Sequence, residues 1–125
     1  MTLSRILIVD DSEADQFLCE YAIEHYDPAI EVKKVFDGKE ALDFIENAEN
    51  DVDIIFLDIN MPGMNGFDFL EIYKNYDGDN KAKIIMLTSS VESEDYERCM
   101  QYDEVEQFLS KPLHMDKIGE FLKLH

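Results

Sequence analysis

The sequence predicts an α/β fold in which a parallel sheet is covered by helices on both faces. Continuous apolar runs, such as Ile6–Val9 and Ile54–Leu57, are typical of strands that are buried on both faces. Longer amphipathic stretches separate these runs, and such alternation favours right-handed crossovers between parallel strands. At 125 residues the chain has the length of one domain. Five strands and five helices use this whole length, so we expect a single domain over residues 1–125.

Five segments are expected to form the strands of this sheet. In chain order they are Arg5–Asp10, Glu31–Phe36, Asp53–Asp58, Lys83–Leu87 and Gln107–Ser110. The second segment is more polar than the others. Because a strand in the middle of a parallel sheet is covered on both faces, we expect this polar segment at an edge.

Five amphipathic stretches are expected to be helices. Ser12 is the predicted N-cap of the first, whose apolar side chains are expected to share one buried face: Ala14, Phe17, Leu18, Tyr21 and Ala22. The other four are predicted to span Gly38–Asn47, Gly66–Tyr76, Ser93–Tyr102 and Met115–Leu124. Ser93 is a second predicted cap, and Met115 is expected to share a face with Ile118 and Leu122.

The acidic composition limits the classes of partner. The chain holds 29 Asp and Glu against 11 Lys and Arg, a formal net charge of -18. Such a charge opposes binding to nucleic acid or anionic lipid, and it favours divalent cations or basic partners. There is no N-terminal signal region and no apolar run long enough to span a bilayer. Cys19 and Cys99 lack metal-ligand spacing and are expected to be buried thiols, so we expect a cytoplasmic protein.

Polar residues follow four of the predicted strands at the point where each strand ends. Asp10 and Asp11 follow the first strand, Asp58 ends the third, Thr88 follows the fourth and Lys111 the fifth. The carboxyl ends of parallel strands point into one crevice, where ligands bind. Carboxylates gathered there repel one another unless a cation is bound. The pattern therefore predicts a cation site at this edge of the sheet.

The same residues carry a family resemblance over nearly the whole chain. Asp10-Asp11, Leu57-Asp58-Ile-Asn-Met-Pro62, Met64-Asn-Gly66, Leu87-Thr88-Ser89 and Phe108-Leu-Ser-Lys111-Pro112 follow one another in this order. Together they resemble the receiver domain of two-component response regulators. The resemblance implies a flavodoxin-like doubly wound fold with strand order 2-1-3-4-5. It also implies a chemotaxis-protein-like receiver of the single-domain type, with no output domain.

The acidic residues suit Mg²⁺, a hard ion that prefers oxygen ligands and keeps some of its waters. Asp11 and Asp58 are the expected direct ligands, with the backbone carbonyl of Asn60 as a third. The choice of Asp11 over Asp10 follows from the resemblance. Asp10 is expected to hold a coordinated water and to orient its neighbours.

Asp58 is the candidate phosphoacceptor, because an aspartate carboxylate can accept a phosphoryl group and form an acyl phosphate. Phosphoryl transfer depends on positioning and on neutralising charge at the equatorial oxygens. Lys111 can supply a positive charge, and Thr88 with nearby backbone amides can donate hydrogen bonds. The resemblance further implies a cis bond between Lys111 and Pro112.

The resemblance also implies a switch, in which Thr88 moves toward the phosphoryl group and Phe108 rotates inward. Phenylalanine has no hydroxyl, so a switch through Phe108 would depend on packing alone. Ser89 should leave the acceptor accessible, while Asn60 and Ser90 are expected to tune the lifetime of the phosphorylated state. Gly66 is expected to form a positive-φ turn.

One segment departs from the family pattern, which usually has a small, glycine-containing turn before the fifth strand. Here that turn is replaced by Tyr102–Gln107, and the surface gathers acids against Arg98, namely Glu94, Asp95, Glu97, Asp103, Glu104 and Glu106. We therefore expect a monomer or weak dimer, or a basic partner. The expected phosphodonor is a sensor histidine kinase or a phosphotransfer protein, and the downstream protein is unknown.

Other functions remain open at this point. The protein could pass its phosphoryl group onward as a phosphorelay intermediate, or serve as a scaffold that is never phosphorylated. A flavodoxin-like redox protein would need a glycine- and hydroxyl-rich loop after the first strand to bind its cofactor phosphate. Asp10 and Asp11 would repel that phosphate. A phosphatase with an aspartyl nucleophile would need a second carboxylate where Asn60 stands.

Overall fold

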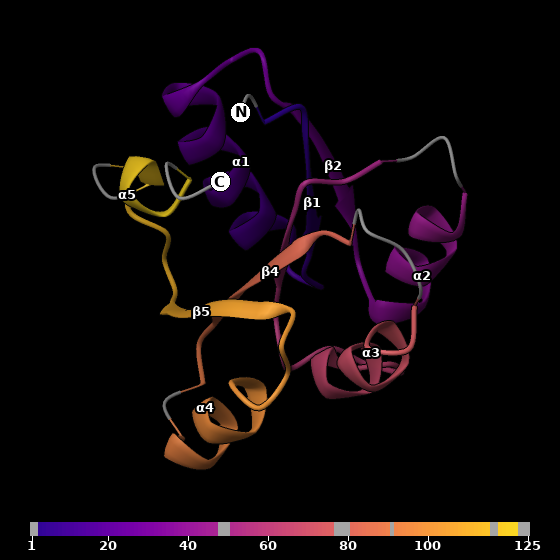
Figure 1. Ribbon diagram of the computed structural model, residues 1–125. Coiled ribbons are helices and arrows are strands. Elements are labelled where there is room, and N and C mark those ends of the chain that lie inside the picture. Colours follow the sequence, from indigo (N-terminus) through magenta and orange to yellow (C-terminus); the bar gives the residue numbers. More distant parts are fainter. Residues whose placement is uncertain (1–2, 48–50, 77–80, 91, 116–117, 123–125) are drawn as a thin grey trace.

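A five-stranded parallel sheet with strand order β2-β1-β3-β4-β5 forms the centre of the protein (Figure 1). The computed structural model describes residues 3–47, 51–76, 81–90, 92–115 and 118–122. The strands are β1 (Arg5–Val9), β2 (Glu31–Val35), β3 (Ile54–Leu57), β4 (Lys83–Thr88) and β5 (Val105–Ser110). All four neighbouring pairs are parallel. The predicted fold class and strand order are confirmed, and the polar strand β2 is at an edge as expected.

Five helices cover the two faces of this sheet. They are α1 (Glu13–Tyr26), α2 (Gly38–Glu46), α3 (Gly66–Tyr73), α4 (Ser93–Cys99) and α5 (Ile118–Leu122). Helices α1 and α5 lie on one face, and α2, α3 and α4 lie on the other (Figure 1). The result is the flavodoxin-like, doubly wound arrangement that the sequence analysis expected.

Side chains of the central strands divide between two cores because successive residues of a strand point to opposite faces. In β1, Leu7 and Val9 join the core under α2 and α3, whereas Ile6 and Ile8 join the core under α1 and α5. All four are at most 1% exposed. Burial on both faces explains why these strands are continuously apolar in the sequence.

The face of α1 that is buried differs from the predicted one. Phe17, Leu18 and Tyr21 are 63%, 47% and 51% exposed, although they were expected in the core. The inward face keeps Ala22 from the predicted set and otherwise carries Gln16, Cys19 and Ile23, while the predicted Ala14 is exposed. The amide of Gln16 donates to the backbone oxygens of Asp10 and Val35 at 2.8 and 2.6 Å. These hydrogen bonds provide donors for two backbone carbonyl groups at the ends of β1 and β2. Because Gln16 must face inward to make them, the aromatic side chains of α1 lie on its outer face.

Several helix ends also differ from the prediction. Helix α3 ends at Tyr73 rather than Tyr76, and α4 ends at Cys99 rather than Tyr102. Ser93 is not a cap, because Glu92 occupies the N-cap position and makes no side-chain capping bond.

The C-terminal helix is predicted from residue 115 to 124, of which 116–117 and 123–124 lie outside the described residues. Met115 precedes α5 and is 39% exposed, whereas Ile118 and Leu122 are buried.

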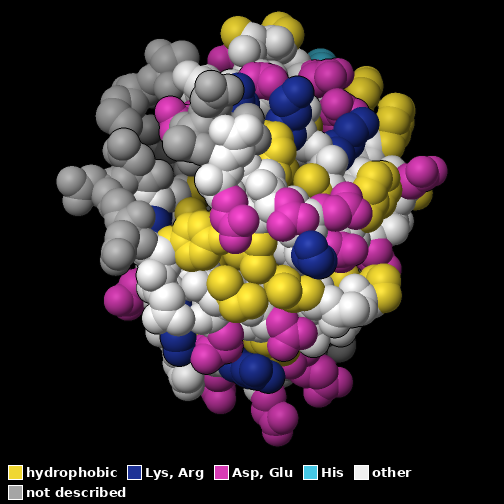
Figure 2. All heavy atoms as spheres, turned by 90° about the vertical axis from the view of Figure 1, so that its right-hand side faces the viewer, with side chains coloured by type: hydrophobic (Ala, Val, Ile, Leu, Met, Phe, Trp, Pro, Cys, Tyr) yellow, Lys and Arg dark blue, Asp and Glu magenta, His cyan; other side chains and the backbone are white. Residues whose placement is uncertain are grey.

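Both cysteines are buried and unbonded, as expected. Burial raises the pKa of the Cys99 thiol to about 11 and raises that of Cys19 further. No helix in the described part of the chain is long and apolar enough to cross a membrane. On the face that carries α2 and α3, acidic side chains surround a hydrophobic area (Figure 2).

Candidate functional site

The polar residues at the ends of the strands meet at one edge of the sheet. Asp10 directly follows β1, and Asp58 directly follows β3, the strand that pairs with it. The backbone N–H of Asp58 donates to the Val9 oxygen at 3.0 Å. The N–H of Lys111 donates to the Thr88 oxygen at 3.0 Å, which aligns the ends of β4 and β5.

Three carboxylates form what we call the aspartate cluster: Asp10, Asp11 and Asp58. One oxygen from each lies within 4.8 Å of the others. Asp10 and Asp58 are 3% and 4% exposed, whereas Asp11 is exposed. Backbone amides hold the two buried carboxylates, since Asp10 Oδ1 accepts from the Ser12 N–H at 2.9 Å and Asp58 Oδ1 from the Ile59 N–H at 2.7 Å.

Lys111 brings a positive charge into contact with this cluster. Its Nζ lies 2.8 Å from Asp10 Oδ2 and 3.0 Å from Asp58 Oδ2, and its side chain is only 12% exposed. Burial alone would lower the pKa of Lys111, but its carboxylate partners raise that pKa well above the ordinary value. Lys111 is therefore held protonated in the site and is not an ordinary surface lysine. The Lys111–Pro112 peptide bond is cis.

Burial has the opposite consequence for Asp10. Loss of solvation raises the pKa of Asp10, and the hydrogen bonds from Lys111 and Ser12 offset this only in part. The charge of Asp58 raises it further. Three carboxylates lie near one ammonium group here, and a divalent cation would relieve both their repulsion and the cost of burying Asp10 charged.

The donor set fits Mg²⁺. All three side chains of the aspartate cluster offer carboxylate oxygens, the hard ligands that this ion prefers, and the exposed position of Asp11 leaves room for coordinated water. Asn60 is exposed and lies two residues after Asp58. Its backbone carbonyl stays a predicted ligand.

The loop after β3 brings Asp58 close to the start of α3. The N–H of Gly66 donates to the backbone carbonyl oxygen of Ile59 at 2.9 Å. A Cβ atom at Gly66 would lie 2.4 Å from the backbone carbonyl oxygen of Asp58. The expected positive φ at Gly66 is wrong, because the residue with this geometry is Gly63, whose φ is 70°. Glycine is needed at position 66 because the backbones approach closely, not because of its φ angle.

The two predicted switch residues occupy different surroundings. Thr88 is fully buried, and its hydroxyl oxygen accepts from the Ser90 N–H at 3.3 Å. Phe108 is partly buried and packs edge-on against Tyr96, with ring centroids 5.5 Å apart. Ser89 is exposed beside Thr88. Their roles in switching stay predictions.

Asp15 contacts the site, although the sequence analysis did not include it. It lies in the first turn of α1, and its Oδ2 is 2.8 Å from Lys111 Nζ. An acidic residue near a helix N-terminus is usually explained by the helix dipole. The only sequence signal was its position four residues after Asp11, which places both near the start of the same helix.

The acidic surface before β5 is more neutralised than the sequence suggested. Lys81 pairs with Glu104 at 3.3 Å, and Lys83 pairs with Glu106 at 3.5 Å. Arg98, which was expected to face the acids, places its guanidinium 3.9 Å from the centre of the Phe67 ring.

Comparisons with known proteins agree with this geometry. A family model described as the response regulator receiver domain matches residues 6–123. The heme response regulator HssR of Staphylococcus epidermidis is 33% identical over 113 residues, which cover 90% of this chain and 46% of that protein. The chain thus spans about half the length of this relative.

Solved structures show the same relationship. A two-component response regulator from Cytophaga hutchinsonii is 26% identical with a TM-score of 0.87, covering 99% of this chain and 97% of that chain. The chemotaxis response regulator CheY4 of Vibrio cholerae is 28% identical with a TM-score of 0.81, covering 98% of each chain. With its strand order and its aspartates in place, this chain belongs to the response regulator receiver domain family of two-component signalling.

Proposed function

We propose that Asp58 accepts a phosphoryl group in a two-component phosphorelay and that Mg²⁺ is required for the transfer. The observation that carries this proposal is the contact of Lys111 Nζ with Asp58 Oδ2 at 3.0 Å, beside two further carboxylates. A buried carboxylate with an adjacent ammonium and a cation site offers a nucleophile and charge neutralisation together.

The phosphodonor is a phosphohistidine on a sensor histidine kinase or a phosphotransfer protein. An oxygen of Asp58 bonds to phosphorus while the bond from phosphorus to the imidazole nitrogen breaks. The bonding electron pair goes to that nitrogen, which takes up a proton. Within this chain, Asp58 is the acceptor, Lys111 binds a phosphoryl oxygen, and Thr88 donates its hydroxyl proton, which its contact with the Ser90 N–H does not use.

Asp11, Asp58 and the Asn60 carbonyl would hold Mg²⁺, with Asp10 supporting a coordinated water. The bound ion would supply positive charge to the phosphoryl oxygens during the transfer. Asp10 and Asp58 are buried, whereas Asp11 is exposed and would be the carboxylate nearest to solvent when the ion is bound.

Phosphorylation would change a protein-binding surface through Thr88 and Phe108. Phe108 is only partly buried and rests on the exposed ring of Tyr96, so its rotation would alter the surface of α4 and β5. The net charge of -18 opposes self-association, and we infer a monomer or weak dimer that acts in the cytoplasm on an unknown protein.

The test is phosphorylation by acetyl phosphate in the presence of Mg²⁺, followed on a phosphate-affinity gel. Wild type should shift, Asp58→Asn should not, and removal of Mg²⁺ should abolish the shift. Asp43→Asn, the same change on the exposed face of α2, is the matched control and should shift like wild type. A shift in Asp58→Asn equal to that of wild type would refute the proposal.

A further inference from the structure

One carboxylate at the site has no part in the function proposed above. Asp15 contacts the same ammonium group as Asp10 and Asp58, yet it lies on a helix and not at a strand end. Its side chain is 36% exposed, whereas those of Asp10 and Asp58 are each 5% exposed. The contact spans 96 positions of sequence.

The ammonium group of Lys111 has as many acceptors around it as it has donors. A lysine ammonium carries three N–H donors. Carboxylate oxygens of Asp10, Asp15 and Asp58 lie 2.8, 2.8 and 3.0 Å from its nitrogen. A phosphoryl oxygen can therefore receive a hydrogen bond from Lys111 only if one of these contacts is given up.

Burial decides which contact can be released. A carboxylate that loses its partner inside the protein keeps the full cost of desolvation. Asp10 would bear that cost, as would Asp58 until an anion is bound to it, whereas the more exposed Asp15 can be hydrated by solvent. Asp15 is therefore the partner whose contact with Lys111 opens most easily.

We propose that Asp15 is a positioning residue for Lys111, which holds the ammonium in the unmodified protein and competes for it with an anion bound at Asp58. The identity of that anion rests on the proposed function, but the contact itself does not. Asp15 keeps the lysine ordered and thereby weakens the binding of phosphoryl groups. It also adds a fourth negative charge that repels an anionic phosphodonor.

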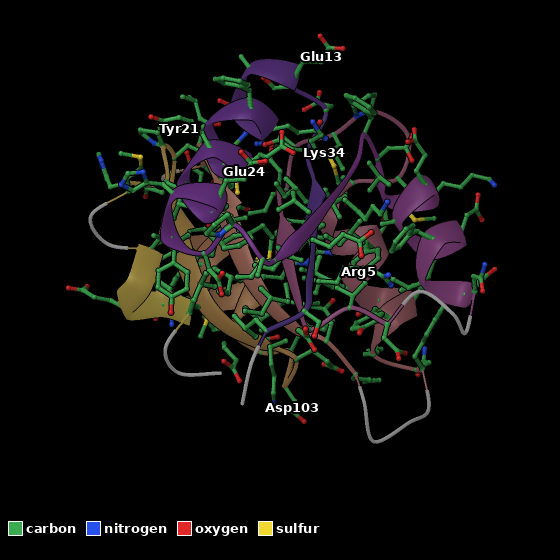
Figure 3. The ribbon with its side chains drawn as sticks, turned by 90° about the horizontal axis from the view of Figure 1, so that it is seen from above. Arg5, Glu13, Tyr21, Glu24, Lys34 and Asp103 are labelled. Atoms are coloured by element: carbon green, nitrogen blue, oxygen red, sulfur yellow. The ribbon has the colours of Figure 1, made fainter. Side chains whose placement is uncertain are left out.

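Three variants separate the contact from the charge. Asp15→Asn removes the anionic partner, and Asp15→Glu keeps a carboxylate that can still reach Lys111. Glu13→Gln is the matched control, because it removes one acidic charge from the same first turn of α1. Glu13 points away from the body of the molecule at the start of this helix (Figure 3).

The first measurement is the affinity for beryllofluoride, a phosphoryl mimic, at saturating Mg²⁺. Asp15→Asn should bind it about 3- to 10-fold more tightly, because a charge-assisted hydrogen bond to Lys111 is weakened to that of a neutral amide oxygen. Asp15→Glu and Glu13→Gln should stay within about two-fold of wild type, since they leave the contact in place. Equal affinities in Asp15→Asn and Glu13→Gln would overturn the inference.

The second measurement needs neither Mg²⁺ nor an anion. Nuclear magnetic resonance of the lysine side-chain ammonium reports hydrogen exchange at Lys111 Nζ, which ion pairs slow. Exchange should be faster in Asp15→Asn by about three-fold or more and unchanged in Glu13→Gln. Unchanged exchange in Asp15→Asn would also overturn the inference.

Together, the two measurements distinguish a failure of the proposed function from a failure of the inference about Asp15. A wild type that never becomes phosphorylated or binds beryllofluoride refutes the proposed function. In that case faster exchange at Lys111 in Asp15→Asn still supports Asp15 as its positioning residue, and unchanged exchange refutes it.

Discussion

Two regions of this molecule each hold a basic side chain near an acidic one, and they do so in opposite ways. In the aspartate cluster, Lys111 is 12% exposed and its ammonium contacts carboxylates directly. The second region, which we call the α3–α4 corner, consists of Phe67, Glu71, Arg98 and Tyr102. There the guanidinium of Arg98 lies over the Phe67 ring, and the Tyr102 hydroxyl donates to the exposed Glu71.

The regions differ both in burial and in the number of charges. In the cluster, three carboxylates lie near one ammonium group, and loss of solvation raises the pKa of the buried Asp10. In the corner, solvent screens the charges, and exposed ion pairs contribute only about 0–1 kcal/mol. A buried excess of carboxylates therefore forms the candidate site in one place, whereas an exposed contact with a ring forms a structural surface in the other.

Replacing the lysine of the cluster should have the largest effect. Lys111→Ala should slow phosphorylation by acetyl phosphate about 100-fold or more, because a preorganised donor to the phosphoryl oxygens is lost. Its Mg²⁺ affinity should not fall, since a competing positive charge is removed. Lys81→Ala, which breaks an ion pair with Glu104 instead, is the control and should keep the wild-type rate. A near-normal rate in Lys111→Ala would mean that burial gives this lysine no special role.

The backbone beneath the cluster should tolerate no added volume. Gly66→Ala should lower the free energy of unfolding by about 3 kcal/mol, because its Cβ would meet the Asp58 backbone, which cannot easily move. In Gly119→Ala the nearest atom is 3.3 Å away in the ring of Tyr26, which can shift. Chemical denaturation of both variants checks this, and equal stabilities would contradict the close approach at Gly66.

A substitution in the α3–α4 corner should have a small effect, and only on the stability of the protein. Arg98→Ala should cost about 0.5–1 kcal/mol of unfolding free energy, the usual contribution of an exposed cation–π contact. Phosphorylation at Asp58 should be unaffected. Thermal denaturation and the phosphate-affinity gel together check both expectations. A large loss of phosphorylation in Arg98→Ala would show that the two regions are coupled.

The smallest expected effect is the dependence of stability on Tyr102 at alkaline pH. Burial and the hydrogen bond to Glu71 raise the pKa of Tyr102 from 10.0 to about 12. The folded protein thus holds this proton more tightly than the unfolded chain, so the contribution to stability is complete below pH 10.0 and is lost as the pH rises through about 12. Tyr73 and Tyr76 also have raised pKa values, so ultraviolet titration should show a late-ionising fraction that becomes smaller in Tyr102→Phe and ionises earlier in Glu71→Gln. An unchanged titration in Glu71→Gln would rule out the contact.

The features that could be predicted from the sequence are those with a strict local pattern. Strands buried on both faces are continuously apolar, so their positions and the residues at their ends, including Asp10 and Asp58, could be identified. The buried face of α1 could not be predicted, because the polar Gln16 is the residue that anchors this helix to the ends of β1 and β2. Apolar periodicity alone favoured Phe17 and Tyr21, which are exposed.

Contacts between residues far apart in the sequence were the other feature that could not be predicted. No local pattern links Asp15 to Lys111, since only the closed fold brings them to 2.8 Å. The role of glycine at position 66 was misassigned for a similar reason. Sequence suggests a turn conformation at such a residue, whereas the constraint is the backbone of Asp58 on another segment.

The order of the site residues along the chain has a consequence for biosynthesis. Asp10, Asp11 and Asp58 leave the ribosome well before Lys111, which follows the last strand of the sheet. A nascent chain that stops short of β5 therefore carries the repelling carboxylates without their lysine. Since domains generally fold as units, Asp58 gains its contact with Lys111 only when the sheet is complete. Truncated chains should then be unable to take up phosphate and send a signal.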